Sequence, residues 1–342
     1  MYMDARRGLA GLLLILLCVS ITIGMQTWIG DVTIYSESLQ AKRALLHESI
    51  LSNTPPDGES WASVGARGTN LRVGTVFLTE LVRKSAGVSV YNAYRLLDSI
   101  FLFLVLVGLY FYLRLWAPDA YCVIGVLYFA TCVPLTYFLY YFHPWDKPQL
   151  LLWLILLYLT RERRFLPLLA CLMLSIVVKF DTILLPGLYL IVHFTREDWK
   201  RVVLETACLA AAASAVYLGL GWLFPAPGDP SRFTFASALS AIHSNLWKLA
   251  AMNVKYPPLL VHTIPLILAT TWVWKRERFV WCSVLFAVGM LGMWFLFSNF
   301  EEVRAEMAAP ILLLPAAVMT LRDLLERGAI ANRRDYLGDP PH

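Results

Sequence analysis

The sequence predicts an all-α, polytopic helical membrane protein. Hydrophobic residues make up 58% of the 342-residue chain and charged residues 15%, whereas soluble domains contain about 25% charged residues. The deficit of charge extends along the whole chain, which excludes a soluble domain carrying a single anchor. Apolar runs recur throughout, and about ten of them have the composition of spanning helices. We therefore expect one integral membrane domain over residues 1–342.

The expected spans begin with residues 8–29, an apolar run that we interpret as an uncleaved first helix. A polar stretch, residues 30–97, follows as the first outer loop. It contains SESLQAKRALLHES and LRVGTVFLTELVRK, whose apolar spacing predicts helices lying along the membrane surface. Further spans are expected at residues 98–116, 118–142, 148–160, 165–180, 182–194, 201–224, 257–274, 279–298 and 309–321, with a second outer loop at 225–256 and a tail at 322–342.

Three of these expected spans are short. Residues 148–160, 165–180 and 182–194 do not easily cross a hydrocarbon core of about 30 Å. Backbone groups that lie within the hydrocarbon core outside a helix must be buried by other protein segments or must line a polar cavity. We therefore expect these three segments to have one end in protein or in a cavity.

The basic residues predict the orientation of the chain. With the N-terminus in the cytoplasm, alternating spans place every strongly basic short loop on the cytoplasmic side. Both termini are then cytoplasmic, in a multi-pass protein that we assign to a bacterial inner membrane. The net charge of +5 is accounted for by this bias, so membrane lipids are expected partners and nucleic acid is not.

Four charged clusters fall on the extracytoplasmic side in this topology. Charge at the edge of a bilayer is costly unless it is paired or used. Their convergence on one face therefore predicts a functional site there. The clusters are Asp31 with Tyr35; His143, Trp145, Asp146 and Lys147 in HPWDKP; Lys179 and Asp181 in KFD; and Glu301, Glu302 and Arg304 in EEVR.

Each cluster has a functional and a structural interpretation. A carboxylate at Asp31 suits a general base, or it simply ends a helix. Lys147 suits a phosphate contact, or it forms an internal pair with Asp146 in a rigid turn. Lys179 likewise meets a phosphate, or pairs with Asp181 to cap the next helix.

Two interpretations remain for the last cluster and for the outer arginines. Arg304 suits bidentate phosphate binding, or it belongs to a solvated acidic loop. Arg67, Arg72 and Arg95 could join an anion site, with solvated charge as the default. Tyr35, His143, Trp145, Glu301 and Glu302 are the remaining candidates for substrate binding.

A metal site has weaker support. Oxygen ligands for a divalent metal would come from Asp31, Glu37, Asp146 and Asp181, provided that the fold gathers them. The sequence contains no P-loop, GxSxG or HExxH motif in the required context. Nothing in the sequence therefore suggests cytosolic ATP hydrolysis by this chain, and a divalent metal is left open.

The chain also resembles a known family. A first helix, an outer loop opening with Asp31, and NLRVGTVFLTELVRKSAGVSVYNAYRLLDSIFLFLVLVGLYFYLRLW followed by LYFATCVPLTYFLYYF resemble the C-type (GT-C superfamily) membrane glycosyltransferases that use polyprenyl-phosphate sugars. The ending EEVRAEMAAPILLLP is similar to that of many members. The resemblance covers roughly residues 1–200 by layout. Many members have two adjacent acids where this chain has Asp31 and Val32.

The resemblance implies a reaction on the extracytoplasmic face. A polyprenyl-phosphate sugar would be the donor, and a glycan, lipid or protein the acceptor. Asp31 would deprotonate the acceptor hydroxyl, and Lys147, Lys179 or Arg304 would neutralise the leaving phosphate. Two alternatives are a transporter or flippase of a lipid-linked or anionic substrate, and a non-catalytic membrane assembly protein. A carrier needs a polar path to both sides, so the one-sided clusters favour an enzyme.

Overall fold

The computed structural model describes residues 11–25, 37–54, 71–135, 144–224, 235–250, 258–297 and 307–337. Within these ranges every regular element is helical, which confirms the all-α prediction. Four helices are long and apolar enough to cross a membrane: Val90–Leu113, Trp199–Leu223, Arg278–Leu296 and Ala308–Glu326. Shorter apolar helices accompany them. The chain is thus consistent with a helical membrane protein, and the number of about ten spans stays a prediction.

The helices follow one another with mostly short connections. After the helix Gly11–Met25 come α2 (Glu37–Ser52), α3 (Val73–Ala86), α4 (Val90–Leu113), α5 (Asp119–Leu135), α6 (Asp146–Arg161), α7 (Phe165–Val178), the 3-10 helix η1 (Phe180–Leu184), α8 (Leu185–His193), α9 (Trp199–Leu223), α10 (Phe235–Ala250), α11 (Pro258–Thr270), the 3-10 helix η3 (Val273–Lys275), α12 (Arg278–Phe297) and α13 (Ala308–Leu337). The segments expected as surface helices are α2 and the amphipathic α3.

Local sequence explains where α4 begins. Ser89 precedes it in an extended conformation, and the Ser89 hydroxyl accepts a hydrogen bond from the Asn92 backbone N–H at 3.2 Å. This N-cap starts the helix eight residues before the apolar run expected to span from residue 98. The charged first turns of α4 are therefore helical as well, and Asp98 lies well inside the helix.

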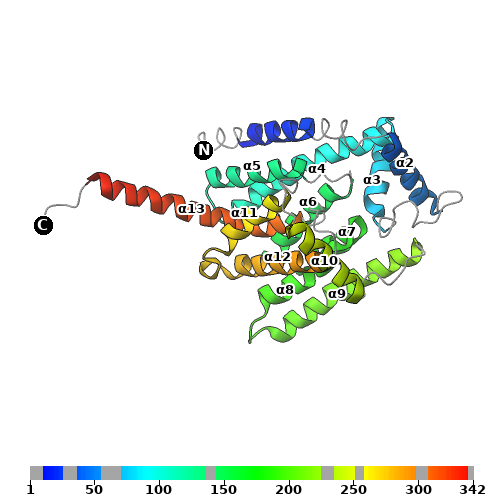
Figure 1. The fold of residues 1–342 in the computed structure, drawn as a ribbon. Coiled ribbons are helices and arrows are strands. Elements are labelled where there is room, and N and C mark those ends of the chain that lie inside the picture. The colour runs from blue at the N-terminus through cyan, green and yellow to red at the C-terminus, as the bar shows by residue number, and fades with distance from the viewer. Residues whose placement is uncertain are drawn as a thin grey trace.

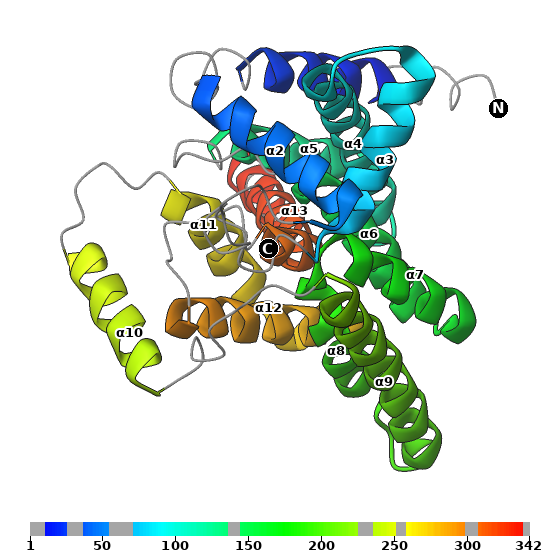
Figure 2. The ribbon, with the colours of Figure 1, turned by 90° about the vertical axis from the view of Figure 1, so that its right-hand side faces the viewer.

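The helices form a bundle with two distinct ends. Figure 1 shows α2 and α3 at one end, whereas the C-terminal part of α13 projects from the opposite end. Viewed onto the α2–α3 end, α10 lies at the periphery of the bundle (Figure 2), where it contacts α12. In the interior α4 packs on α6, α6 on α7, and α13 on α11 and α12.

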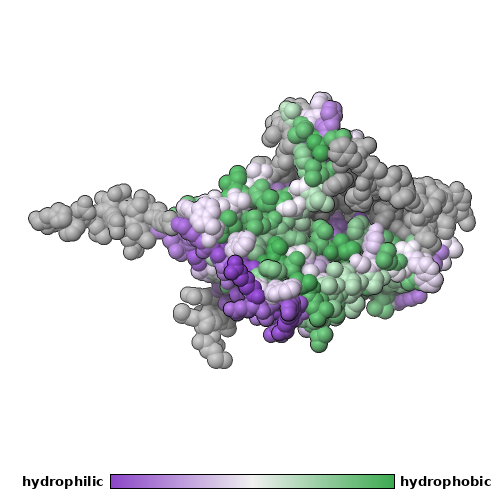
Figure 3. Space-filling view, turned by 90° about the horizontal axis from the view of Figure 1, so that it is seen from below, coloured by the Kyte–Doolittle hydropathy of each residue, from purple (hydrophilic) through white to green (hydrophobic). Residues whose placement is uncertain are grey.

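The second end gathers basic loops. Arg161 at the end of α6 lies 3.5 Å from Glu277, just before α12, and Arg163 lies 2.8 Å from Asp198, just before α9. We call this the basic end. Hydrophilic side chains gather toward it in Figure 3, and apolar side chains cover the middle of that face. The basic loops that the sequence predicts to lie on the cytoplasmic side therefore gather at one end of the bundle.

Large apolar side chains cover parts of the surface. On α9, Trp222 is 82% exposed and Leu218 is 68% exposed. Isolated exposed apolar residues are normal in soluble proteins, but extended apolar surfaces indicate contact with lipid or with another protein. Together with the four long apolar helices, this surface supports placement of the bundle in a membrane.

Candidate functional site

The short helices α7 and α8 form a hairpin that begins and ends near the basic end. Since α7 has 14 residues, it extends about 21 Å at 1.5 Å per residue, short of a hydrocarbon core of about 30 Å. The backbone becomes extended at Lys179 (φ −165°, ψ 132°) and resumes as η1. A helix long enough to cross the hydrocarbon core would continue beyond this point. The charged tip of the hairpin, Lys179 to Asp181, therefore lies closer to the basic end than the end of such a helix would.

Neighbouring helices do extend beyond this tip. Asp98 lies eight residues into α4 and pairs with Lys147 at the start of α6, so α4 continues about 12 Å further. The Phe180 ring lies 5.6 Å from the Tyr217 ring, which is six residues before the end of α9, so α9 continues about 9 Å further. The start of α6 and the hairpin tip thus lie together at a level below the ends of α4 and α9, and we call this polar cluster around Lys179 the recess.

The helix α3 covers the recess from the α2–α3 end. The guanidinium of Arg72, just before α3, lies 4.8 Å from the ring centre of Trp145 and 5.9 Å from that of Phe180, within cation–π range. A Cβ atom added to Gly74 would lie 3.2 Å from the backbone oxygen of Val177. A side chain at position 74 would therefore require α3 and the end of α7 to move apart by a few tenths of an ångström.

A buried histidine joins this cover to α4. His47 of α2 is 1% exposed; its Nε2 lies 3.1 Å from the carboxylate of Glu80 in α3, and its Nδ1 lies 2.9 Å from the hydroxyl of Tyr94 in α4. Hydrogen bonds from Arg83, and then from His47, hold the pKa of the Glu80 carboxyl well below its usual range. Three helices are therefore fixed together through one polar cluster.

The recess contains a lysine bound by two carboxylates. Lys179 Nζ lies 3.2 Å from Asp146 Oδ1 and 3.4 Å from Asp181 Oδ2, and the Lys179 side chain is 11% exposed. A lysine ammonium has three N–H donors. Among the described residues only two acceptors contact it, which leaves one donor for a ligand. The KFD interpretation of a Lys179–Asp181 pair is thus observed, with Asp146 as an additional partner.

Gln149 fixes the floor of the recess. Its amide nitrogen donates to the backbone oxygen of Lys179 at 2.9 Å and to the carboxylate of Asp181, and it contacts the hydroxyls of Ser175 and Thr182. The amide therefore ties α6 to both arms of the hairpin. The sequence analysis did not select Gln149. A single amide side chain within the apolar run PQLLLW could have indicated a buried polar contact.

Lys147 points to a different partner. It forms a hydrogen-bonded ion pair with Asp98, and both side chains are buried. Asp98 Oδ1 has no hydrogen-bond partner among the described residues. Burial of a charge in this way requires a partner of opposite sign. Asp98 was also missed, because it is the first residue of the expected span and was not considered as a member of any charged cluster.

The structure brings together five of the candidates from two separate motifs. The five are Trp145, Asp146, Lys147, Lys179 and Asp181. The other candidates, Asp31, Tyr35, His143, Glu301, Glu302 and Arg304, lie outside the described residues. Whether they join the recess stays a prediction.

Metal binding has no cluster to support it in the described part of the chain. No group of three or more His, Cys, Asp or Glu side chains lies close enough there to hold an ion. Asp146 and Asp181 both contact Lys179, and that ammonium already balances part of their charge. A divalent metal held by Asp31, Glu37, Asp146 and Asp181 stays an open prediction, because Asp31 lies outside the described residues.

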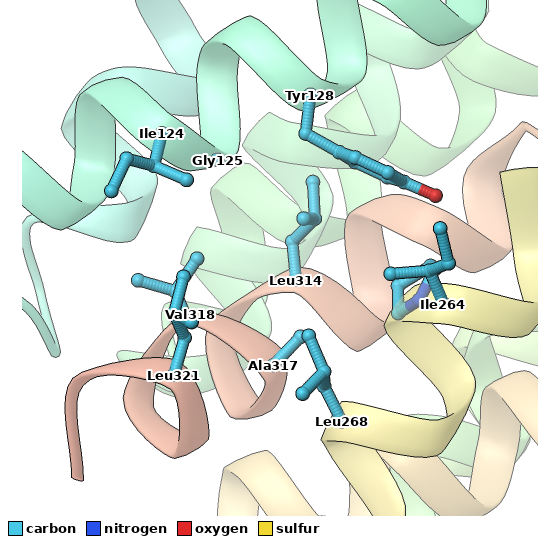
Figure 4. Close-up of a pocket in the computed structure, with 10 residues that line it drawn as sticks. Ile124, Gly125, Tyr128, Ile264, Leu268, Leu314, Ala317, Val318 and Leu321 are labelled. Carbon is cyan, nitrogen blue, oxygen red and sulfur yellow. The ribbon is translucent and has the colours of Figure 1, made fainter. Parts of the chain in front are cut away.

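An apolar pocket elsewhere offers no chemistry. Figure 4 shows it between α5, α11 and α13, where Ile124, Leu314 and Leu268 face one another across a space of about 160 Å³. The Tyr128 hydroxyl donates to the backbone oxygen of Val261 at 2.9 Å. Because the lining is otherwise apolar, the polar recess is the better candidate for a site.

Comparisons of this chain with protein-family models, with curated proteins and with solved structures find no match. The resemblance to the C-type glycosyltransferases therefore stays a prediction from the sequence. Function has to be argued from the recess itself.

Proposed function

We propose that the chain is a membrane glycosyltransferase. It moves a sugar from a polyprenyl-phosphate donor to a glycan, lipid or protein acceptor on the extracytoplasmic face, with Asp31 as the general base. The observation that supports this most is Lys179, a nearly buried cation with one available donor in a recess below the ends of α4 and α9. A lipid phosphate can reach that depth while its chain stays in the hydrocarbon.

The proposed chemistry is a direct displacement. Asp31 takes the proton from the acceptor hydroxyl as its oxygen bonds to the anomeric carbon. The bond from that carbon to the phosphate oxygen breaks, and polyprenyl phosphate leaves with the bonding electrons. Lys179 stabilises the negative charge on this leaving group, which is the main requirement of the step. Asp146 and Asp181 hold the ammonium in position.

The distribution of polar groups supports an enzyme over a carrier. Among the described residues, most charged side chains gather either around the recess or at the basic end. Between these ends α6 buries Trp153, Leu156 and Leu157. A carrier requires polar groups along a path between both sides, and α6 provides none at these positions.

Two substitutions test the proposal in membranes that contain a polyprenyl-phosphate-sugar donor. Lys179→Gln should abolish donor turnover and weaken retention of polyprenyl phosphate by the purified protein, and Lys179→Arg should restore part of both. Asp31→Asn should retain polyprenyl phosphate but lower transfer by about 10²–10⁴-fold, the usual contribution of a general base. Lys84→Gln, at a 70% exposed lysine of α3, is the matched control. Wild-type turnover in Lys179→Gln at normal expression would exclude the proposed role of Lys179.

A further inference from the structure

A second pocket lies between α4 and α6 on the outer surface of the bundle, close to the basic end. Its volume is about 340 Å³, within the range of roughly 300–1,000 Å³ typical of ligand sites. Phe111 and Ile155 line it and are 58% and 40% exposed. The pocket therefore opens sideways, toward the surface that the bundle presents to lipid. It shares no residue with the recess around Lys179.

Gly108 is one of the residues that line this pocket. A Cβ atom added there would lie 3.4 Å from Leu154 Cδ1 and 3.7 Å from Leu151 Cδ1, which is ordinary contact. The glycine is thus not required for helix packing. Without a side chain at position 108, the pocket is bordered there by Leu151 and Leu154 of α6, an apolar lining that suits a hydrocarbon chain.

Two phenol groups give the pocket a polar end. Tyr112, near the end of α4, is 4% exposed, and its hydroxyl has no hydrogen-bond partner within the described ranges. Tyr158, one turn before the end of α6, lines the same pocket and is 39% exposed, so the cost of burial applies to Tyr112 alone. A buried hydroxyl without a partner is costly. An acceptor supplied by a ligand would remove that cost.

Arginines flank the polar end of the pocket. Arg161 lies one turn beyond Tyr158 and places its guanidinium 5.3 Å from the Trp116 ring. Arg114 directly precedes Leu115, another residue of the lining. Both arginines have carboxylate partners: Arg161 lies 2.7 Å from Glu162 and 3.5 Å from Glu277, and Arg114 lies 2.9 Å from Asp119. A guanidinium has five N–H donors, so each retains donors for a further anion.

We propose that this pocket binds an anionic glycerophospholipid from the leaflet at the basic end. One acyl chain lies along Gly108 between Leu151 and Leu154, an ester carbonyl accepts a hydrogen bond from Tyr112, and the phosphate lies near Arg161. The site is separate from the recess and does not depend on the proposed glycosyl transfer. Binding would join α4 to α6, the two helices that also carry Asp98 and Lys147.

Native mass spectrometry of the intact, detergent-purified protein tests the site, with phosphatidylglycerol and phosphatidylcholine as probes. The wild type should retain phosphatidylglycerol, and retain it more strongly than phosphatidylcholine. Gly108→Leu fills this part of the pocket and should abolish retention. Gly219→Leu is the matched control, because the added Cβ on α9 has no neighbour within 4 Å. Equal loss in Gly108→Leu and Gly219→Leu, or no loss in either, would overturn the site.

Two conservative variants keep the test independent of folding. Tyr112→Phe removes only the hydroxyl and should weaken retention several-fold without a loss of secondary structure. Arg161→Gln should remove the preference for phosphatidylglycerol while leaving binding of phosphatidylcholine unchanged. Wild-type retention in Tyr112→Phe would exclude the ester contact. Equal retention of the two lipids by the wild type would exclude recognition of an anionic headgroup.

Discussion

Lys147 pairs with Asp98 of α4, and its neighbour in the sequence, Asp146, pairs with Lys179 at the tip of the α7–α8 hairpin. Two adjacent residues thus connect α6 to two different helices. The Lys147 pair is almost fully buried, with side-chain exposures of 3% and 10%. The Lys179 pair lies in the recess and retains a donor for a ligand. We interpret the first pair as structural, and the second is the one that we propose binds substrate.

We predict that Asp98→Asn strongly destabilises the protein. The substitution removes the carboxylate charge that pairs with the buried Lys147 ammonium, and loss of one partner of a buried ion pair costs about 3–5 kcal/mol. Unfolding of the detergent-solubilised protein by heat or denaturant measures this loss.

The control is the exposed pair Arg114–Asp119. Asp119→Asn should cost no more than about 1 kcal/mol, as is usual for surface pairs. The double variant Asp98→Asn with Lys147→Met should recover most of the stability, because no unpaired charge is left. An equal loss in the single and double variants would contradict the explanation by charge.

We predict an acid-sensitive attachment of α2 and α3 to α4. The folded-state pKa of Glu80 is lowered by Arg83 and His47, so this carboxylate stabilises the fold fully above its unfolded pKa of about 4.3. The contribution should be lost as the pH falls from that value through the lower folded pKa. Glu80→Gln should therefore flatten the dependence of the thermal midpoint on pH between about 5 and 2. Glu48→Gln, at an exposed residue of α2, should keep the wild-type dependence.

We predict that a larger side chain at Gly74 lifts α3 from the hairpin. The added Cβ would lie 3.2 Å from both the backbone oxygen and the side chain of Val177, so Gly74→Leu should cost about 1–3 kcal/mol by overpacking. Hydrogen exchange of the α3 amides should increase while exchange in α12 stays unchanged. Unchanged protection of α3 would show that the contact with α7 is not tight.

We predict that the two ends of the bundle face opposite sides of the membrane. Thr54 and Glu197 are both exposed, the first after α2 and the second in the loop between α8 and α9. In a background without the six native cysteines, Thr54→Cys should react with an impermeant thiol reagent from outside. Glu197→Cys should react only after the membrane is opened. Labelling of both from the same side would exclude the proposed topology.

The sequence alone was sufficient to predict several features of the fold. Apolar runs located the helices, because hydrophobicity and helical spacing are local properties of the chain. Expected spans at 165–180 and 201–224 correspond closely to α7 and α9. The shortness of 148–160 and 165–180 predicted an end inside protein, and the start of α6 and the end of α7 both lie on the floor of the recess. The helix α4 begins earlier than the expected span at residue 98, because the N-cap at Ser89 and not the hydropathy of the segment determines its start.

The candidate site was only partly predictable. Lys179 and Asp181 were recognised because charges between apolar runs are conspicuous in any sequence. Gln149 and Asp98 were not, since their importance depends on which helix faces them. Arg72 was treated by default as solvated, yet it lies over Trp145 beneath the start of α3.

The sequence by itself therefore determined that this is a helical, membrane-type chain with charged clusters between its apolar segments. Only the tertiary structure decided how those charges pair. Successive residues on a helix point about 100° apart, so Asp146 and Lys147 meet different neighbours. Which neighbours these are depends on the packing of α4 and α7 against α6, and no local pattern in the sequence records that packing.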